Sequence, residues 1–253
     1  MEKMLLERVS ANLARLKLSH TSGAIIDKIK QYENSSKTHL QFLDELLEEE
    51  VTHKEQRRVE TALKIAGLPF VKSLDEYDLA FHPELDQKKV MTLFDLTFLQ
   101  RKENIFFLGP PGVGKTHLAV SVALKACQAG MSIYFTTMSD LIEKLKADKA
   151  KGKDGRGRSY LKSALVVVDE VGYTPVNREE CHLFFQFISY RYEKSSTIIT
   201  SNKAFNEWSE LFEDPVIVTA ILDRLLHHSA VITIKGHSYR LKDKFIFKKG
   251  GDA

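Results

Sequence analysis

The segment Gly109-Pro110-Pro111-Gly112-Val113-Gly114-Lys115-Thr116 decides the fold of this chain. It matches G-x-x-x-x-G-K-[ST] and lies between an apolar run at 104–108 and a helix expected at 116–129, the setting of a phosphate-binding loop. Glycines let backbone N–H groups turn toward phosphate oxygens, Lys115 adds positive charge, and the Thr116 hydroxyl can bind Mg²⁺. The helix that follows directs its positive end at the same anion. The residues expected to bind the nucleotide are Gly109, Pro110, Pro111, Gly112, Val113, Gly114, Lys115, Thr116 and His117.

Two carboxylates follow a second strongly apolar run at 165–168. Asp169 lies 54 residues beyond Lys115, and Glu170 directly follows it. Both stand at the carboxyl end of an expected buried strand, where ligands bind in open α/β sheets. In an ATPase, the first of these carboxylates holds Mg²⁺ and the second polarises the attacking water. We expect Asp169 to share the metal with Thr116, and Glu170 to act as the catalytic base.

The expected strand at 197–200 is followed by two polar residues, Ser201 and Asn202. If this strand neighbours the phosphate-loop strand, Asn202 lies beside the two carboxylates and orients the water or contacts the γ-phosphate. The alternative is that it caps the strand end. Asn202-Lys203 also begins the guanine signature N-K-x-D, but residue 205 is Phe. Because no carboxylate accepts from the guanine N–H groups, we expect ATP as the nucleotide.

Short apolar runs alternate with helical stretches after Lys102, as is typical of a parallel sheet covered by helices on both faces. The expected strands are 104–108, 132–136, 165–169, 197–200 and 230–234, and the expected helices are 116–129, 139–149, 178–193 and 216–228. This order predicts an α/β P-loop NTPase domain with a five-stranded parallel sheet flanked by helices.

The N-terminal part of the chain has helical periodicity instead. A break at Asn34-Ser35-Ser36 precedes a capping box formed by Thr38 and Gln41. A smaller, all-helical N-terminal domain is therefore expected before the sheet. The expected divisions are a helical domain at 1–69 and an ATPase domain at 70–253, with a connector at 70–102 that packs on both.

Composition places the chain among globular proteins. It has 253 residues, with 37 Lys and Arg against 34 Asp and Glu and 43% hydrophobic residues, which excludes a disordered chain. The longest apolar run, 164–168, is far shorter than the roughly 20 residues of a membrane span. Glu2 and Glu7 interrupt any signal sequence, and Cys127 and Cys181 predict neither a disulfide framework nor a zinc site. We expect a cytoplasmic protein with no membrane partner.

Positive charge is concentrated between Lys144 and Lys162, where 8 basic residues stand against 2 acidic ones. Three glycines in this segment prevent one continuous helix, and a basic loop suits the phosphates of duplex DNA. A solvated surface is the alternative interpretation. The candidate DNA-binding residues are Lys149, Lys151, Lys153, Arg156 and Arg158.

Two arginines near the end of the chain are candidate catalytic residues. Arg224 lies on an expected helix, where it is either a surface ion-pair partner or an arginine finger that reaches the nucleotide of a neighbouring subunit. Arg240 follows the last expected strand. The adjacent His227 and His228 are expected to project about 100° apart on a helix and therefore not to form a metal-binding pair.

Several segments together closely resemble the IstB family. They are the phosphate-binding loop, 168–173, 199–202, 220–228 and 234–241. IstB proteins are AAA+ ATPases that help the transposase of certain bacterial insertion sequences, and they are related to the DnaC and DnaI helicase loaders. The resemblance covers nearly the whole chain. It implies Walker A at 109–116, Walker B at 165–170, a sensor at Asn202, an arginine finger at Arg224 and a second sensor at Arg240.

The resemblance also implies how such a protein acts. ATP-bound subunits would form a homo-oligomeric ring or spiral whose basic segment grips double-stranded DNA, largely without reading its sequence, and would present that DNA to a cognate transposase. A helicase loader is the alternative, but the absence of any cysteine before Cys127 and the run at 220–228 favour the transposition helper. Only 18 residues follow Lys235, so no separate C-terminal lid is expected, and Arg240 does not sit on a lid helix.

Overall fold

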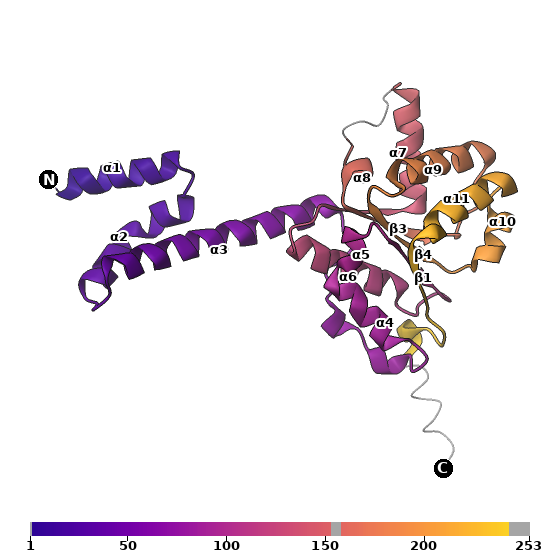
Figure 1. Ribbon diagram of the computed structural model, residues 1–253, viewed down its shortest axis with the longest axis horizontal. Helices are drawn as coiled ribbons and strands as arrows, with labels where there is room; N and C mark the ends of the chain where they lie inside the picture. Colours follow the sequence, from indigo (N-terminus) through magenta and orange to yellow (C-terminus); the bar gives the residue numbers. More distant parts are fainter. Residues whose placement is uncertain (1, 153–157, 243–253) are drawn as a thin grey trace, which may run out of the picture. The chain divides into compact units, whose positions relative to one another are not determined.

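The computed structural model describes residues 2–152 and 158–242 (Figure 1). The chain forms two compact units, Met1–Thr61 and Ala62–Ala253. The first unit is helical and the second contains the sheet. Among the described residues, no helix is both long enough and apolar enough to cross a membrane.

The helices of the first unit are α1 (Glu2–Arg15), α2 (Ser19–Glu33) and α3 (His39–Ala66) as far as Thr61. The turn between α1 and α2 is not predicted by the sequence. Lys17 has a φ of 59° there, and the Leu18 N–H donates to the carbonyl oxygen of Leu13 at 2.9 Å, which closes the end of α1. No glycine or proline marks this turn, so the sequence pattern predicts only the later break.

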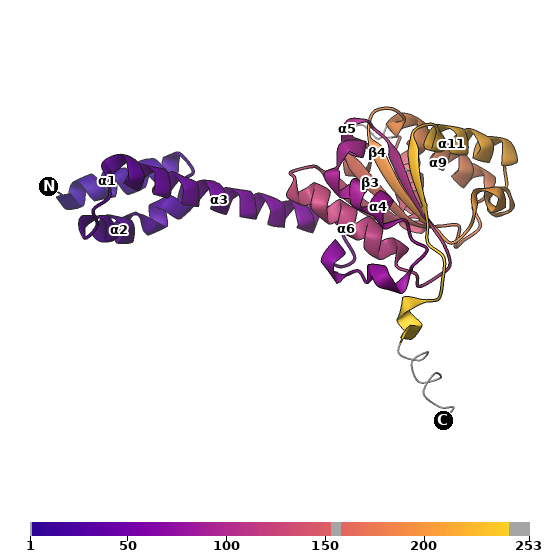
Figure 2. The same cartoon turned by 60° about the horizontal axis from the view of Figure 1, so that its bottom comes forward.

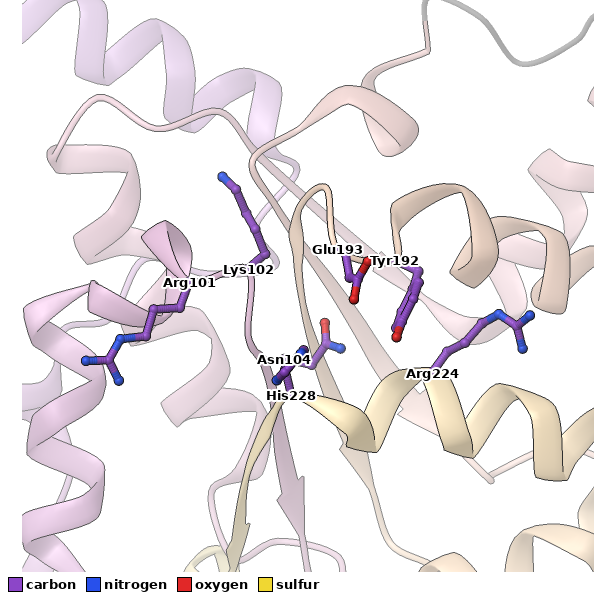
Figure 3. Close-up of a pocket in the computed structure, with 7 residues that line it drawn as sticks. All are labelled: Arg101, Lys102, Asn104, Tyr192, Glu193, Arg224 and His228. Atoms are coloured by element: carbon purple, nitrogen blue, oxygen red, sulfur yellow. The ribbon is translucent and has the colours of Figure 1, made fainter.

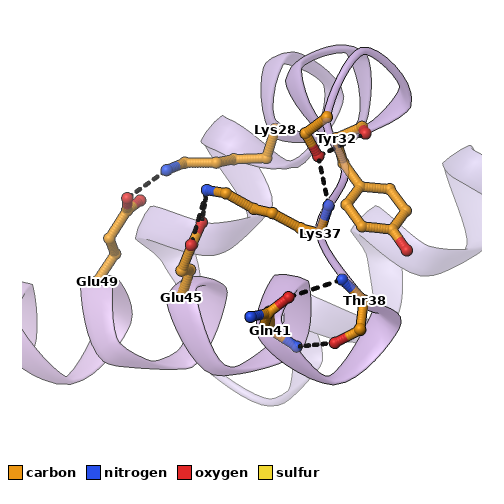
Figure 4. A network of polar contacts seen from close by, with 8 residues as sticks. Lys28, Tyr32, Lys37, Thr38, Gln41, Glu45 and Glu49 are labelled. Carbon is orange, nitrogen blue, oxygen red and sulfur yellow. Dashed lines mark hydrogen bonds and ion pairs between the residues drawn. The ribbon is translucent and has the colours of Figure 1, made fainter.

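The predicted break before α3 is confirmed, and Figure 4 shows the contacts that fix it. The Thr38 N–H donates to Gln41 Oε1 at 2.8 Å, and the Gln41 N–H donates to Thr38 Oγ1 at 3.3 Å. These reciprocal bonds form the expected capping box, which satisfies two N–H groups at the start of the helix. An ion pair between Lys28 and Glu49 joins α2 to α3.

The second unit is built on the predicted five-stranded parallel sheet (Figure 2). Its strands are β1 (Asn104–Leu108), β2 (Ile133–Thr137), β3 (Leu165–Val171), β4 (Ser196–Ser201) and β5 (Ser229–Thr233). They lie in the order β2-β3-β4-β1-β5, and every neighbouring pair is parallel. Because β4 lies between β1 and β3, the carboxyl ends of these three strands meet at one edge of the sheet.

Helices cover both faces of this sheet, as predicted. Along β1, Ile105 and Phe107 pack with α6 (Lys115–Gln128) and the connector, whereas Phe106 and Leu108 pack with α7 (Met138–Ala150), α9 (Arg178–Arg191) and α11 (Pro215–His227). Strands buried on both faces explain why the sequence shows continuous apolar runs instead of alternation. The helices are α4 (Gln87–Thr92), α5 (Thr97–Gln100), α6 (Lys115–Gln128), α7 (Met138–Ala150), α8 (Ser159–Lys162), α9 (Arg178–Arg191), α10 (Trp208–Leu211) and α11 (Pro215–His227).

Short turns complete the part of the second unit that bears on the site. The connector contains the 3₁₀ turns η1 (Leu74–Glu76) and η2 (Leu79–Phe81) before α4, and η3 (Leu93–Asp95) after it. Beyond β5, the described chain contains a single 3₁₀ turn, η5 (Tyr239–Leu241). Between β5 and Lys242, this turn is the one helical element in the described chain.

Arg191, the last residue of α9, is a buried cation that the sequence does not reveal. Its side chain is 2% exposed, and burial lowers the pKa of its guanidinium to about 9. The guanidinium is surrounded by hydrogen-bond acceptors, so its positive charge is satisfied without a carboxylate. The acceptors are the carbonyl oxygens of Tyr160, Leu161, Ser163 and Ser196 and the hydroxyl of Thr197.

Arg191→Leu should destabilise the second unit by about 3–5 kcal/mol, because several buried carbonyl oxygens lose their donor. The single tryptophan, Trp208, is buried in this unit, so urea unfolding followed by its fluorescence reports the loss. Arg178→Ala is the matched control, because Arg178 starts the same helix, is 75% exposed and pairs with Asp214 at the surface. The control should cost at most about 1 kcal/mol. Equal losses in the two variants would contradict the anchoring role.

Candidate nucleotide-binding site

The phosphate-binding loop connects β1 to α6, and two other segments pack tightly on its glycines. Gly112 has a φ of 82°, and a Cβ there would lie 2.0 Å from Ser238 Oγ. Gly114, which caps α6, has a φ of 92°, and a Cβ there would lie 2.5 Å from the Tyr77 ring. Side chains at either position would both clash and strain the backbone. The connector and the segment after β5 therefore hold the loop in place.

Lys115 begins α6, and its side chain is 6% exposed. Its Nζ donates to the carbonyl oxygens of Gly109 and Pro110, both at 2.8 Å. Burial lowers the pKa of Lys115, the Asp169 carboxylate opposes this shift, and the charge of Arg240 adds to it. Two cations are thus within electrostatic reach of each other, an arrangement that an anionic phosphate would stabilise.

Thr116 and Asp169 meet at the carboxyl edge of the sheet. Thr116 Oγ1 donates to the two carboxylate oxygens of Asp169 at 3.0 and 3.1 Å, and the Thr200 hydroxyl at the end of β4 also donates to Asp169. Hydroxyl and carboxylate oxygens are the ligands that Mg²⁺ prefers, so these residues fit the predicted metal. Thr200 is a site residue that the sequence motifs do not predict, although its place at the end of a strand between β1 and β3 is a usable signal.

Glu170 has an unusual backbone conformation. Its φ is 62°, and the pairing of β3 with β4 shifts register between Val168 and Val171. The Glu170 N–H donates to Thr200 Oγ1 at 3.0 Å. Such bulges redirect a side chain and often lie next to active sites. Here the bulge leaves Glu170 exposed at the end of a buried strand, next to Asp169.

These groups line one cavity of about 640 Å³, a volume typical of small-molecule sites. His117 forms part of the wall, with its ring edge-on to the Tyr77 ring at 5.3 Å between centroids. Gly109 and Pro110 contribute the carbonyl oxygens that Lys115 bonds. The predicted nucleotide-binding residues that line the cavity are Pro111, Gly112, Val113, Gly114, Lys115, Thr116 and His117, together with Asp169, Glu170 and Arg240.

Comparison with known proteins agrees with this geometry. A family model described as IstB-like ATP binding protein matches residues 11–246. The chain belongs to this family. An insertion sequence IS21 protein of Pseudomonas aeruginosa, named for ATP binding, is 46% identical over 233 residues, which cover 92% of this chain and 88% of the relative.

Two further comparisons extend the likeness of this IstB-like chain. An insertion sequence IS5376 protein of Geobacillus stearothermophilus, also named for ATP binding, is 43% identical over 205 residues, covering 81% of this chain and 82% of the relative. A crystal structure of DnaI is similar with a TM-score of 0.53 and 20% identity, over 64% of this chain and 90% of that one. The likeness to DnaI concerns the fold, which is that of the AAA+ P-loop NTPases.

Arg240 of this IstB-like chain reaches the cavity from beyond the last strand. It lies in η5, and the neighbouring Tyr239 N–H donates to the carbonyl oxygen of Gly112 in the phosphate-binding loop at 2.9 Å. Arg240 lines the cavity, and its charge acts on the pKa of both Lys115 and Tyr173. The segment that carries Arg240 thus contacts the phosphate-binding loop directly.

Asn202 and Arg224 do not line the cavity. Asn202 follows β4, and its Oδ1 is buried without a hydrogen-bond partner in the described structure. Arg224 lies on α11, donates to the carbonyl oxygen of Ala220 at 3.0 Å and stacks over the Phe185 ring at 4.7 Å. It borders a separate cavity, and Figure 3 shows its guanidinium pointing away from Asn104. A catalytic role for Arg224 therefore requires the nucleotide of another subunit.

The basic segment is only partly described. Lys149 pairs with Glu179 at 2.7 Å, and Arg158 pairs with the buried Asp148. Lys151 is exposed. The other two predicted DNA-binding residues, Lys153 and Arg156, lie outside the described residues. Lys149 and Arg158 thus have protein partners, which the sequence does not predict.

The expected separation of His227 and His228 is wrong. Helix α11 ends at His227, and His228 leaves the helical conformation with φ −128° and ψ 91°. The two rings consequently lie 4.0 Å apart between centroids. The helical angle of 100° applies only while both residues are inside the helix.

Proposed function

We propose that this IstB-like protein binds ATP with Mg²⁺ and hydrolyses it. The observation that carries the proposal is the cavity in which Lys115, Thr116, Asp169 and Glu170 come together. The two relatives above, both named for ATP binding, support the choice of ligand. Measuring ATP binding and phosphate release by the purified full chain, with Lys115→Ala as the loss-of-binding control, tests the proposal.

In the proposed reaction, Lys115 exchanges its bonds to loop carbonyl oxygens for bonds to the β- and γ-phosphates. Thr116 and Asp169 would hold Mg²⁺, and the bound ion would supply positive charge next to the phosphate oxygens. Glu170 accepts a proton from the attacking water. Asn202 does not line the cavity in this structure, so it orients that water only if its side chain turns toward it. Arg240 offsets negative charge in its own subunit. Arg224 of a neighbouring subunit stabilises the charge that develops on the transferred phosphoryl group.

The proposed biological role is that of a transposase helper. ATP-bound subunits assemble as a ring or spiral on duplex DNA and present it to the cognate transposase, and hydrolysis releases the assembly. The relatives from insertion sequences support this role. The alternative is a helicase loader of the DnaC or DnaI type, but the likeness to DnaI concerns the fold alone. ATP-dependent co-purification with the element's transposase, and not with the replicative helicase, distinguishes the two roles.

Replacing Lys151, Lys153 and Arg156 together by Ala should weaken binding to all duplexes alike. Each lost phosphate contact should reduce the slope of log affinity against log salt concentration by about 0.9, as measured with a labelled duplex over a salt series. The control with the same charge change replaces three exposed lysines on other elements, Lys64, Lys88 and Lys125. If both triple variants kept the original slope, the basic segment would be a solvated surface.

A further inference from the structure

Two histidines and a glutamate converge where α9 and α11 end, outside the nucleotide cavity. Glu193, His227 and His228 each offer one ligand atom, and these three atoms all lie within 4.8 Å of one another. All three residues are exposed. In Figure 3, Glu193 points toward Asn104 and His228, and the ends of Arg101 and Lys102 extend away from it. The nucleotide chemistry proposed above uses none of the three ligand residues.

The backbone that carries these ligands is anchored on both sides. The Asn104 N–H donates to the carbonyl oxygen of His228 at 2.8 Å, and Asn104 Nδ2 donates to that of Leu225 at 3.1 Å, so the end of α11 is fixed to β1. The end of α9 is fixed by the buried Arg191 guanidinium. Glu193 follows within two residues and has a φ of 58°. The backbone that carries the three ligand residues is therefore fixed before a metal binds.

A hydrogen bond orients one of the imidazole rings. His227 Nδ1 lies 2.8 Å from the Tyr192 hydroxyl. Metal-binding histidines characteristically use their second ring nitrogen for such a bond, which fixes the ring and leaves the first nitrogen for the metal. Tyr192 therefore orients the His227 ring and does not itself bind the metal. The rings of His227 and His228 lie 4.0 Å apart between centroids.

We propose that Glu193, His227 and His228 bind a divalent transition metal, with Zn²⁺ as the natural candidate. Two imidazole nitrogens and one carboxylate oxygen suit Zn²⁺, whereas Mg²⁺ and Ca²⁺ prefer oxygen ligands alone. Because the ligands are exposed, water completes the tetrahedral shell. Binding pulls the three ligand atoms closer together and clamps the end of α9 to the end of α11.

Nearby charges set the strength and the consequence of binding. Arg101, Lys102 and Arg224 border the small cavity that Glu193 and His228 also line. Their positive charges repel a dication, so the site should bind a metal more weakly than a closed structural zinc site does. Arg224 lies in the last turn of α11, four residues before His228. The metal thus fixes the helix end that carries Arg224. The importance of this effect for hydrolysis rests on the proposed function, whereas metal binding itself is independent of that function.

Co²⁺ titration of the full-length protein tests the site, because four-coordinate Co²⁺ has visible absorption bands that report its ligands. Excess Mg²⁺ occupies oxygen-only sites, and nucleotide is omitted so that ATPase activity plays no part. We expect one Co²⁺ per chain that Zn²⁺ displaces. His228→Ala and Glu193→Gln should each weaken Co²⁺ binding at least tenfold, and Tyr192→Phe about tenfold.

His182→Ala is the matched control, because His182 is an exposed histidine on α9 outside the cluster. It should bind Co²⁺ as the original protein does. Trp208 fluorescence during urea unfolding checks that each variant is folded, and the near-isosteric Glu193→Gln keeps the test valid if His228→Ala misfolds. Absence of a Zn²⁺-displaceable band, or equal affinity in Glu193→Gln and His182→Ala, would overturn the proposal.

Discussion

Glu170→Gln should lower the rate of ATP hydrolysis by about 10²–10⁴-fold, because the attacking water loses its general base. ATP binding should be nearly unchanged, since Lys115 and Thr116 remain and the glutamine keeps the size of the side chain. DNA-dependent assembly should persist and outlast that of the original protein. Phosphate release under saturating ATP, together with nucleotide affinity from equilibrium binding, gives both quantities.

A second exposed glutamate supplies the control for that experiment. Glu179→Gln makes the same chemical change at an exposed carboxylate on α9 that pairs with Lys149, and it should hydrolyse ATP normally. A Glu170→Gln protein that turned over at the original rate would show that another group takes the proton. The strained φ of 62° at residue 170 would then need another explanation.

Much of the ATPase domain is predictable from the sequence because its signals are local. Buried parallel strands appear as unbroken apolar runs, and all five lie within two residues of their expected bounds. Helix starts are marked by side-chain caps, as where Asn177 accepts from the Glu180 N–H at 3.0 Å, and where Asp214 precedes Pro215. The phosphate-binding loop combines glycine conformation and a lysine in one short motif.

The missing parts of the site are non-local. Tyr77 reaches the loop from 36 residues away and donates to the carbonyl oxygen of Val113 at 3.1 Å, yet its neighbours in sequence carry no sign of this contact. Ser238 and Arg240 arrive from beyond the last strand. Because the sequence predicts no lid helix, it does not predict which element brings Arg240 to the cavity. Tertiary packing alone brings these residues to the loop.

Two other features differ from the sequence-based prediction because a helix ends where no glycine or proline marks the end. Lys17 turns the chain between α1 and α2 with a left-handed φ that lysine seldom adopts. His228 leaves α11 one residue before the predicted end, and this small shift decides whether two imidazoles diverge or converge. Helix ends are uncertain by one or two residues in any sequence-based prediction, and here a functional hypothesis depends on one of them.

Arg224→Ala should lower the rate of ATP hydrolysis by about 10³–10⁵-fold, the range observed for arginine fingers. ATP affinity should change little, because Arg224 borders a cavity separate from the nucleotide site. Arg101→Ala is the control, since Arg101 is an exposed arginine bordering the same small cavity. Urea unfolding followed by Trp208 fluorescence separates a catalytic loss from the loss of the Arg224–Phe185 contact.

The central claim is that hydrolysis occurs between subunits, and mixing two inactive variants tests it most directly. Lys115→Ala lacks the phosphate contact and Arg224→Ala lacks the finger, so each should be nearly inactive alone. In an equal mixture on duplex DNA, about one quarter of the interfaces should pair an intact Lys115 with an intact Arg224 of the neighbour, and ATPase activity should recover accordingly. No recovery at any ratio, with co-assembly of the two variants verified by pull-down, would contradict the claim.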